Sequence, residues 1–283
     1  MKIKNKVLSA VFIISAASVF SANAEKPGNF GKCDVKVPDK KLPLTPKEND
    51  TLTVATVLPN PGWFNGLSPE KVDGGFEYCL AANIASRAGL HHIKIRNLAW
   101  DQFISGTVKD YDIAMSNATI TDARKKVFDF TQSYFDSNLG VAVKKNADVN
   151  ENNIRSKRVG VLQGNLGAEW VSKTLKPSAI SIFQSQSDMF TGLMAGQVDA
   201  VITDTTLVLT QAKASGNQIK AAGQFELKQG YGVITPLHSA NSKNVDSIVG
   251  DLKSDGTLNA LGDKWLKPLF GVAPSDVPVW SVK

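Results

Sequence analysis

The sequence predicts an α/β fold with two lobes, each a mostly parallel sheet flanked by helices, and two crossover strands that join the lobes. The first observation behind this prediction is that β-branched, alternating segments take turns with segments of helical periodicity, in two successive sets. Such alternation favours parallel sheets covered by helices. The second observation is that two extended segments, 139–144 and 230–235, bracket the second set, so the chain is expected to leave the first lobe there and return.

The first set starts with a strand and continues with helices and strands in turn. Its clearest helix covers 76–87, because Phe76, Leu80 and Ile84 recur every four residues and Gly89 follows as a stop signal. The expected elements of this set are strands at 51–58, 92–98 and 111–116 and helices at 76–87 and 100–108.

The second set repeats this alternation, and two helices close the chain. Polar segments with Gly and Asp, at 254–256 and 262–263, are expected to break the closing helices. The expected elements are strands at 158–162, 181–183 and 198–203, helices at 166–175 and 188–195, and closing helices at 244–253 and 258–266.

These elements divide the chain into an arm, two lobes and a tail. Lobe 1 is expected to comprise 51–140 together with 234–270, and lobe 2 to comprise 145–229. The segment 25–50 is polar and rich in Lys and Pro, and is predicted to be an irregular N-terminal arm, while 271–283 forms a C-terminal tail. We expect a monomer.

The first 24 residues have the pattern of a secretory signal peptide. Three lysines precede an uncharged, mostly apolar stretch, and Ala22-Asn23-Ala24 gives the small residues that a signal peptidase recognises. The apolar stretch is shorter than the roughly 20 residues that span a bilayer. We therefore expect an exported, periplasmic protein without a transmembrane helix.

Export also bears on the two cysteines, Cys33 and Cys79. In an oxidising compartment such a pair suggests a disulfide, the alternative being two separate buried thiols. His91 and His92 are adjacent and His238 lies far away in the sequence, so no metal or other cofactor is expected. The net charge of +6 falls to +3 without the three signal-peptide lysines. No long basic run with interleaved aromatics occurs, which argues against nucleic acid as a partner.

The segment 111–126 carries the most informative chemistry. A buried strand is expected to end at Ser116, and Thr121 is placed to cap a following helix. Arg124 would lie in the first turn of that helix, where its planar fork of donors can bind a carboxylate in two places. The alternative is a solvated arginine in an Arg-Lys-Lys patch.

This segment resembles the polar amino-acid-binding family of type II periplasmic binding proteins. The family pattern of a Ser/Thr-rich loop followed by Thr-x-x-Arg is similar to 119–124, which read Thr-Ile-Thr-Asp-Ala-Arg. Further similar segments occur in family order over about 51–270: Gly-Phe-Glu at 75–77, Trp-Asp at 100–101, Gly-Val-Leu-Gln-Gly at 160–164, the strand ending in Asp at 196–204, and the closing segments at 255–258 and 264–266.

The resemblance implies that the protein captures a free amino acid between its lobes and delivers it to the membrane permease of an ABC importer. Arg124 would hold the α-carboxylate, with help from Thr119, Asn117 and Ser116 on the same loop. Asp204 would face the α-ammonium from lobe 2, although a carboxylate there can also cap the helix that follows.

Several positions depart from the family pattern. The family has Gly followed by two hydroxyl residues where this chain has Gly164-Asn165-Leu166, so backbone N–H groups would have to serve there. Relatives that bind cationic side chains carry an acid where this chain has Val57, so we expect an uncharged ligand side chain. Three aromatic residues are candidates to line the pocket or to be core residues: Trp63, Phe64 and Trp100.

Two alternative functions share this scaffold. Cyclohexadienyl dehydratases resemble these binding proteins but need a positioned general acid, and Asp204 is the one acid expected in the cleft. A soluble protein that presents its ligand to a sensor would have the same sequence features. We expect a binding protein rather than an enzyme.

Overall fold

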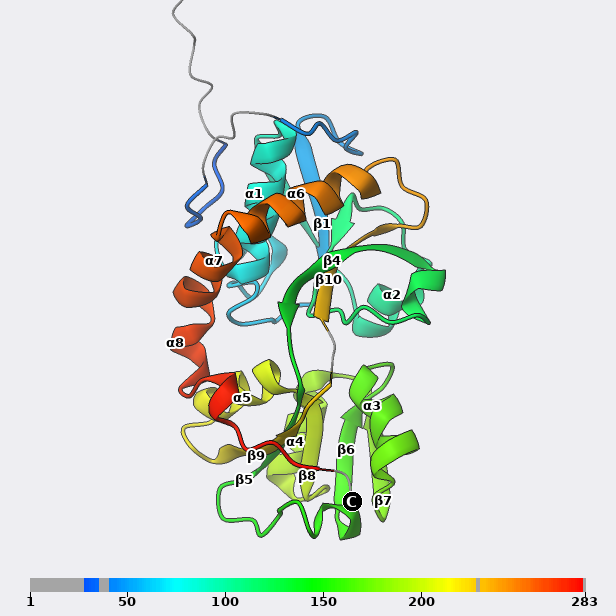
Figure 1. Cartoon of the computed structure of the whole chain (residues 1–283), viewed down its shortest axis with the longest axis vertical. Helices are drawn as coiled ribbons and strands as arrows, with labels where there is room; N and C mark the ends of the chain where they lie inside the picture. The colour runs from blue at the N-terminus through cyan, green and yellow to red at the C-terminus, as the bar shows by residue number, and fades with distance from the viewer. Residues whose placement is uncertain (1–27, 36–40, 228–229, 282–283) are drawn as a thin grey trace, which may run out of the picture.

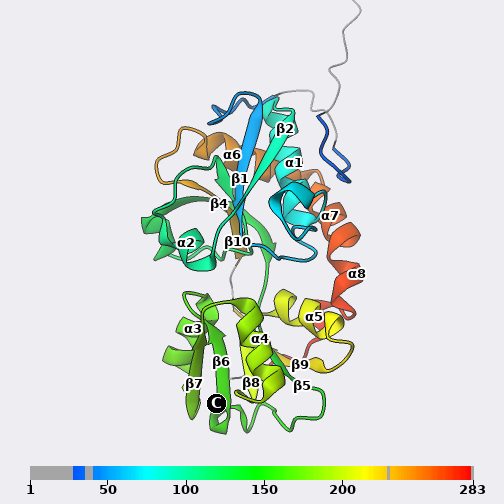
Figure 2. The ribbon, with the colours of Figure 1, turned by 180° about the vertical axis from the view of Figure 1, so that it is seen from behind.

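The computed structural model describes residues 28–35, 41–227 and 230–281, and the predicted signal peptide at 1–24 lies outside this range. Two five-stranded sheets, each with flanking helices, form two lobes (Figure 1). The same two lobes are seen from behind in Figure 2. This arrangement confirms the predicted fold class.

The sheet of lobe 1 has the order β2-β1-β3-β10-β4, and β10 alone runs against the other four strands. Its strands are β1 (Thr51–Thr56), β2 (His92–Asn97), β3 (Ile113–Ala114), β4 (Phe128–Asp136) and β10 (Gly230–Pro236). The helices and short turns of this lobe are η1 (Pro69–Lys71), α1 (Phe76–Ala88), α2 (Trp100–Ser105), η2 (Arg124–Lys126), α6 (Ser242–Ser254), α7 (Thr257–Trp265) and α8 (Lys267–Phe270).

The sheet of lobe 2 repeats this layout in the order β7-β6-β8-β5-β9, with β5 as the reversed strand. Its strands are β5 (Leu139–Lys144), β6 (Arg158–Leu162), β7 (Ala179–Phe183), β8 (Ala200–Asp204) and β9 (Ile219–Phe225). Its helices and turns are η3 (Ile154–Ser156), α3 (Leu166–Trp170), which continues as η4 (Val171–Leu175), then α4 (Gln186–Ala195), α5 (Thr205–Ala214) and η5 (Pro274–Asp276).

The crossovers differ from the sequence-based expectation. The segments 139–144 and 230–235 were expected to run between the lobes, but β5 and β10 are inner strands of their sheets. The chain changes lobe just before each of them, after β4 and after β9. The strands β4 and β9 were themselves not predicted. Each is the last strand of its sheet, and the alternation of buried and exposed residues along it is weak.

Other elements are shorter or longer than expected. The strand at 111–116 is reduced to the two residues of β3, and the helix at 100–108 ends at Ser105, where Gly106 follows with a left-handed φ of 71°. The helix expected after Thr121 is the single turn η2. The break expected at 262–263 is absent, because both residues lie within α7.

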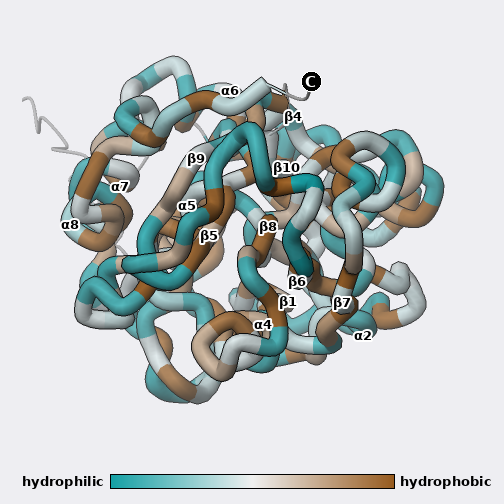
Figure 3. Tube along the Cα trace, turned by 90° about the horizontal axis from the view of Figure 1, so that it is seen from below, coloured by the Kyte–Doolittle hydropathy of each residue, from teal (hydrophilic) through white to brown (hydrophobic). Residues whose placement is uncertain are grey.

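Helix α1 is the centre of lobe 1. All of its residues except Arg87 are buried, because β1 packs on one side of the helix and α6 and α7 cover the other (Figure 1). In lobe 2, β5 and β8 are the most enclosed strands, and their hydrophobic stretches lie toward the middle of the molecule in Figure 3. Among residues 28–35, 41–227 and 230–281, no helix has the length and apolar character needed to cross a membrane.

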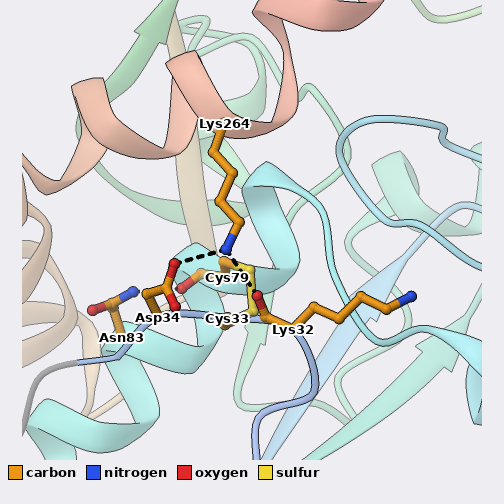
Figure 4. Close-up of a disulfide and its surroundings, with 6 residues drawn as sticks. All are labelled: Lys32, Cys33, Asp34, Cys79, Asn83 and Lys264. Carbon is orange, nitrogen blue, oxygen red and sulfur yellow. Dashed lines mark hydrogen bonds and ion pairs between the residues drawn. A yellow bond between two sulfur atoms is a disulfide. The ribbon is translucent and has the colours of Figure 1, made fainter.

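Cys33 and Cys79 form a disulfide, which confirms the prediction for this pair. The bond ties the N-terminal arm to α1, and Lys264 of α7 contacts the same part of the arm through Asp34 (2.7 Å) and the carbonyl of Lys32 (3.1 Å), as Figure 4 shows. The cysteines are 46 residues apart. Closing a loop of that length contributes roughly 3–4 kcal/mol to the free energy of unfolding.

Candidate ligand-binding site

A cavity of about 530 Å³ lies between the two lobes. Its wall is built from the segments that follow the parallel strands of both sheets, which is where open α/β sheets place their ligands. From lobe 1 these are the ends of β1, β2 and β3, and from lobe 2 the ends of β6, β7 and β8. The lining residues are Val57, Leu58, Pro59, Asn60, Asn97, Leu98, Ala99, Trp100, Asp101, Ser116, Asn117, Leu162, Asn165, Gln184, Ser185, Gln186, Ser187, Asp204 and Leu207.

The loop after β3 brings two predicted residues, Ser116 and Asn117, to this cavity. Both are buried, and Asn117 has a left-handed φ of 54°, a conformation that Asn adopts more readily than most residues. Its side-chain Oδ1 accepts a hydrogen bond from Asn60 Nδ2 at 2.8 Å. Its Nδ2 is buried without a hydrogen-bond partner among the described residues, in a side chain that belongs to the cavity wall.

Asp204 supplies the complementary acceptor from lobe 2. It ends β8 and is 1% exposed. Oδ2 accepts a hydrogen bond from Asn165 Nδ2 at 3.4 Å, whereas Oδ1 has no partner in the described part of the chain. Asp204 occupies the N-cap position of α5, but its side chain makes no capping hydrogen bond. Asp204 lines the cavity from lobe 2.

Burial raises the pKa of Asp204 to about 6, because removal from water disfavours the charged form. Hydrogen bonding with Asn165 and Tyr231 and the positive charge of Arg124 act in the opposite direction. Arg124 belongs to lobe 1, so the charge state of this lobe 2 carboxyl depends on both lobes.

Arg124 is half-buried in the turn η2 and is not a solvated surface residue. Its Nη1 donates to the carbonyl of Thr119 at 2.8 Å, and Nη2 donates to the carbonyl of Gly164 at 3.1 Å. The guanidinium lies 5.6 Å from the ring centroid of Trp100. Arg124 lines a smaller interlobe groove of about 360 Å³ rather than the larger cavity.

Thr121 and Lys125 flank Arg124 at the turn η2. The Thr121 hydroxyl accepts from the backbone N–H of Arg124 at 3.2 Å, so it caps the turn as it was expected to cap a helix. Lys125 is exposed and pairs with Asp122 at 3.6 Å. The basic patch is therefore split, with Arg124 directed between the lobes and Lys125 outside.

The residues after β6 form the lobe 2 edge of the site. Asn165 caps α3, because its Oδ1 accepts from the backbone N–H of Gly167 at 2.6 Å, while its Nδ2 contacts Asp204. Leu166 is half-buried and lines the smaller groove. Where the family pattern has a hydroxyl residue, this chain thus has an amide that fixes the buried carboxylate.

Two contacts hold the lobes together beside the cavity. Trp100 Nε1 donates to the carbonyl of Gln163 at 2.8 Å, next to the contact between Arg124 and Gly164. Gly164 has a left-handed φ of 69°, and a Cβ at this position would lie 2.3 Å from Ile104 Cδ1 of the opposite lobe. The left-handed φ favours glycine here, and a side chain would also have to displace the end of Ile104.

Trp63 and Phe64 do not line either cavity, although they were candidates for a pocket wall. They are 0% and 1% exposed and belong to the core of lobe 1. Trp63 packs edge-on against Phe76, Phe135 and Tyr231. Large aromatic side chains gain most free energy from full burial, and the start of α1 offers that environment.

Sequence reasoning did not point to several wall residues. Asn60 was not singled out, nor were the segments 97–99 and 184–187 or Leu207. Most of these residues could have been found from their position, because they directly follow the carboxyl end of a parallel strand, as the predicted residues do. Glu77 was read only as part of a helix-start motif, yet it contacts the backbone of Asn117.

The fold and the interlobe cavity define a two-lobed solute-binding protein. The sequence pattern of the family described as bacterial extracellular solute-binding proteins, family 3, matches residues 64–268, which is more than half of the chain. The chain therefore belongs to this family.

Individual proteins support the same relationship. The L-cystine-binding protein TcyJ of Escherichia coli K12 is 27% identical over 229 residues, which cover 77% of this chain and 84% of TcyJ. The ABC transporter glutamine-binding protein GlnH of Bacillus subtilis 168 is 27% identical over 161 residues, 56% of this chain and 59% of GlnH.

A solved structure with a similar fold is that of the ancestral amino acid-binding protein AncCDT-1, a precursor of cyclohexadienyl dehydratase. It is 26% identical, with a TM-score of 0.66, over 77% of this chain and 96% of that one. It is thus described as a binding protein, like the two relatives.

The glycine contact gives a testable prediction about lobe closure. Gly164→Ala places a methyl group against Ile104 and also imposes a left-handed φ on alanine, so it should hold the lobes farther apart. Small-angle X-ray scattering should show a larger radius of gyration than for the parent. Gly216→Ala is the matched control, because Gly216 has a φ of 62° but nothing within 4 Å of its Cβ position. An unchanged radius of gyration in Gly164→Ala would contradict the prediction.

Proposed function

We propose that this protein captures a free amino acid in the interlobe cavity and delivers it to the membrane permease of an ABC importer. The observation that carries the proposal is a pair of unsatisfied buried groups on opposite lobes, Asp204 Oδ1 and Asn117 Nδ2. Buried polar groups normally have partners, and leaving them unmet costs free energy. A ligand with both a donor and an acceptor would supply the partners.

The two ends of an amino acid fit these groups. The α-ammonium would donate to Asp204, which is charged above its pKa of about 6. The α-carboxylate would accept from Asn117 and, if the guanidinium turns from the neighbouring groove toward the cavity, from Arg124, which has five N–H donors and uses two of them on Thr119 and Gly164. Because the partners lie on different lobes, the zwitterion is held fully only when the cleft is closed.

Delivery to an importer follows from the family. The family is described as extracellular, and GlnH is named as a component of an ABC transporter. The pattern at 1–24 supports export, and a periplasmic location agrees with the disulfide between Cys33 and Cys79. The relatives above are named for binding, so we propose capture of an amino acid and not its conversion.

We propose that the side chain of the bound amino acid is uncharged. The wall next to the buried groups is apolar at Val57, Leu98 and Leu207, and amides contribute at Asn97 and Gln184. A cationic side chain among these residues would lack a close counter-charge, which is costly in a buried site. The remaining acid of the wall besides Asp204 is Asp101, whose exposed side chain is screened by water.

A binding screen tests this function. Isothermal titration calorimetry of the mature protein against the common amino acids should show binding of neutral ones, and thermal shift should confirm it, since a ligand stabilises the fold by mass action. Cystine and glutamine belong in the screen because the relatives are named for them. Binding of arginine or lysine alone would refute the proposed selectivity, and no binding of any amino acid would refute the function.

Arg124→Ala should weaken amino-acid binding strongly. Removal of one partner of a charged contact costs about 2–5 kcal/mol, which is a roughly 30- to 5,000-fold rise in Kd. Arg124→Lys should restore little, since an ammonium lacks the planar fork. Calorimetry on both variants and on Lys125→Ala gives the measurement, and Lys125→Ala is the control because this neighbour is exposed. Parent-like affinity in Arg124→Ala would remove the carboxylate role from Arg124.

The affinity should also depend on the protonation of Asp204. The carboxylate that would receive the ammonium is charged above its pKa of about 6 and becomes neutral as the pH falls through that value. Binding should therefore weaken about tenfold for each unit below pH 6. Asp204→Asn should bind weakly at every pH and lose this dependence. Calorimetry between pH 8 and pH 5 checks both, and an unchanged Kd at pH 5 would exclude Asp204 as the counter-charge.

A further inference from the structure

Glu77 is a buried acid next to the loop at 116–119, on the side of that loop that faces away from the cavity. It is the second residue of α1 and is 0% exposed. Its Oε1 accepts hydrogen bonds from the backbone N–H of Asn117, at 2.8 Å, and from the hydroxyl of Tyr134. Its Oε2 has no hydrogen-bond partner in the described part of the chain. A carboxyl buried this completely is costly, and these contacts compensate only part of that cost.

A single residue, Asn117, separates Glu77 from the proposed ligand, because Asn117 donates its backbone N–H to Glu77 and also lines the cavity. The backbone N–H of Asn117, a residue with a left-handed φ, donates to Glu77 of α1. Its Oδ1 is held by Asn60, which leaves Nδ2 as the unpaired donor of the cavity. The orientation of this donor therefore depends on a backbone anchor at the same residue.

Other contacts of the loop fix its far end. The backbone N–H of Gly232 donates to the carbonyl of Ala118 at 3.1 Å, and the carbonyl of Thr119 accepts from Arg124. Both anchors lie after Asn117 in the chain. Glu77 thus holds the N-terminal part of the loop, where Asn117 contributes its amide to the cavity.

We infer that Glu77 is a positioning residue for ligand binding, which sets the conformation of the loop at 116–119 through the backbone N–H of Asn117. This inference rests on the proposed function. Glu77 touches no ligand itself, so its effect on affinity passes through Asn117. A hydrogen bond to a charged acceptor is stronger than one to a neutral acceptor, so the anchor is strongest when Glu77 is ionised.

The protonation of Glu77 gives a readout that a purely structural residue would lack. Burial raises the pKa of Glu77 to about 7, while hydrogen bonds from Tyr134 and Asn117 oppose that shift. The other titratable groups on this side are Tyr134, Tyr231 and Asp204. Burial raises the pKa of both tyrosines well above 10, so they stay neutral. Affinity should therefore fall as the pH decreases through about 7, separately from the later loss at Asp204.

Calorimetry from pH 8.5 to pH 5 on three variants tests the inference. Glu77→Gln should raise the Kd about fivefold at pH 8 and abolish the step near pH 7, while the fall below pH 6 remains. Tyr134→Phe removes a donor that lowers the pKa of Glu77, so the step should move to higher pH. Asn83→Ala is the control, because Asn83 is buried in the same helix and donates to the carbonyl of Cys79. The Asn83→Ala substitution should lower the thermal stability and leave the dependence of the Kd on pH unchanged.

The outcomes separate this inference from the proposed function. If the parent binds no amino acid, the proposed function fails. If the parent binds and Glu77→Gln keeps both its affinity and the step near pH 7, the function stands and the role of Glu77 is refuted. If Glu77→Gln does not fold, Tyr134→Phe decides, because an unmoved step in that variant also refutes the role.

Discussion

The carboxylate of Asp204 is removed from water at the end of β8, and its surroundings must supply what water would otherwise provide. Asn165 satisfies one oxygen from the same lobe. The positive charge of Arg124 acts on it from the other lobe and favours its ionised form. The ionised form of Asp204 is therefore stabilised most when positive charge from outside lobe 2 is nearby. This requirement couples the charge of the carboxylate to the position of the two lobes.

The scaffold brings such groups together by repeating one topology twice. In each lobe three parallel strands end at the cleft, and the polar residues that follow them meet there. The inner strands β1, β5 and β8 are apolar and almost fully buried, so rigid strands fix the polar groups at their ends. Connecting segments such as 97–101 and 184–187 also line the cavity, and such segments vary more readily than the sheets that they join.

The sequence was sufficient for the fold class and for the disulfide, because each depends on local patterns or on the order of motifs. It left open whether Trp63 and Phe64 line the pocket or belong to the core, because their burial depends on residues distant in the chain such as Tyr231. It failed for β4 and β9, which are edge strands with weak periodicity. The contact between Glu77 and Asn117 joins residues 40 positions apart, and no local pattern predicts it.

The path of the chain makes the two lobes unequal as folding units. The sheet of lobe 2 is formed by one continuous stretch, from β5 to β9, so both partners of each of its strand pairings lie within that stretch. Lobe 1 is interrupted, and β4 has its strand partner in β10, which comes about a hundred residues later. A chain cut after β9 would retain every strand of the second sheet but would lose β10, the strand that joins β4 to the rest of the first sheet.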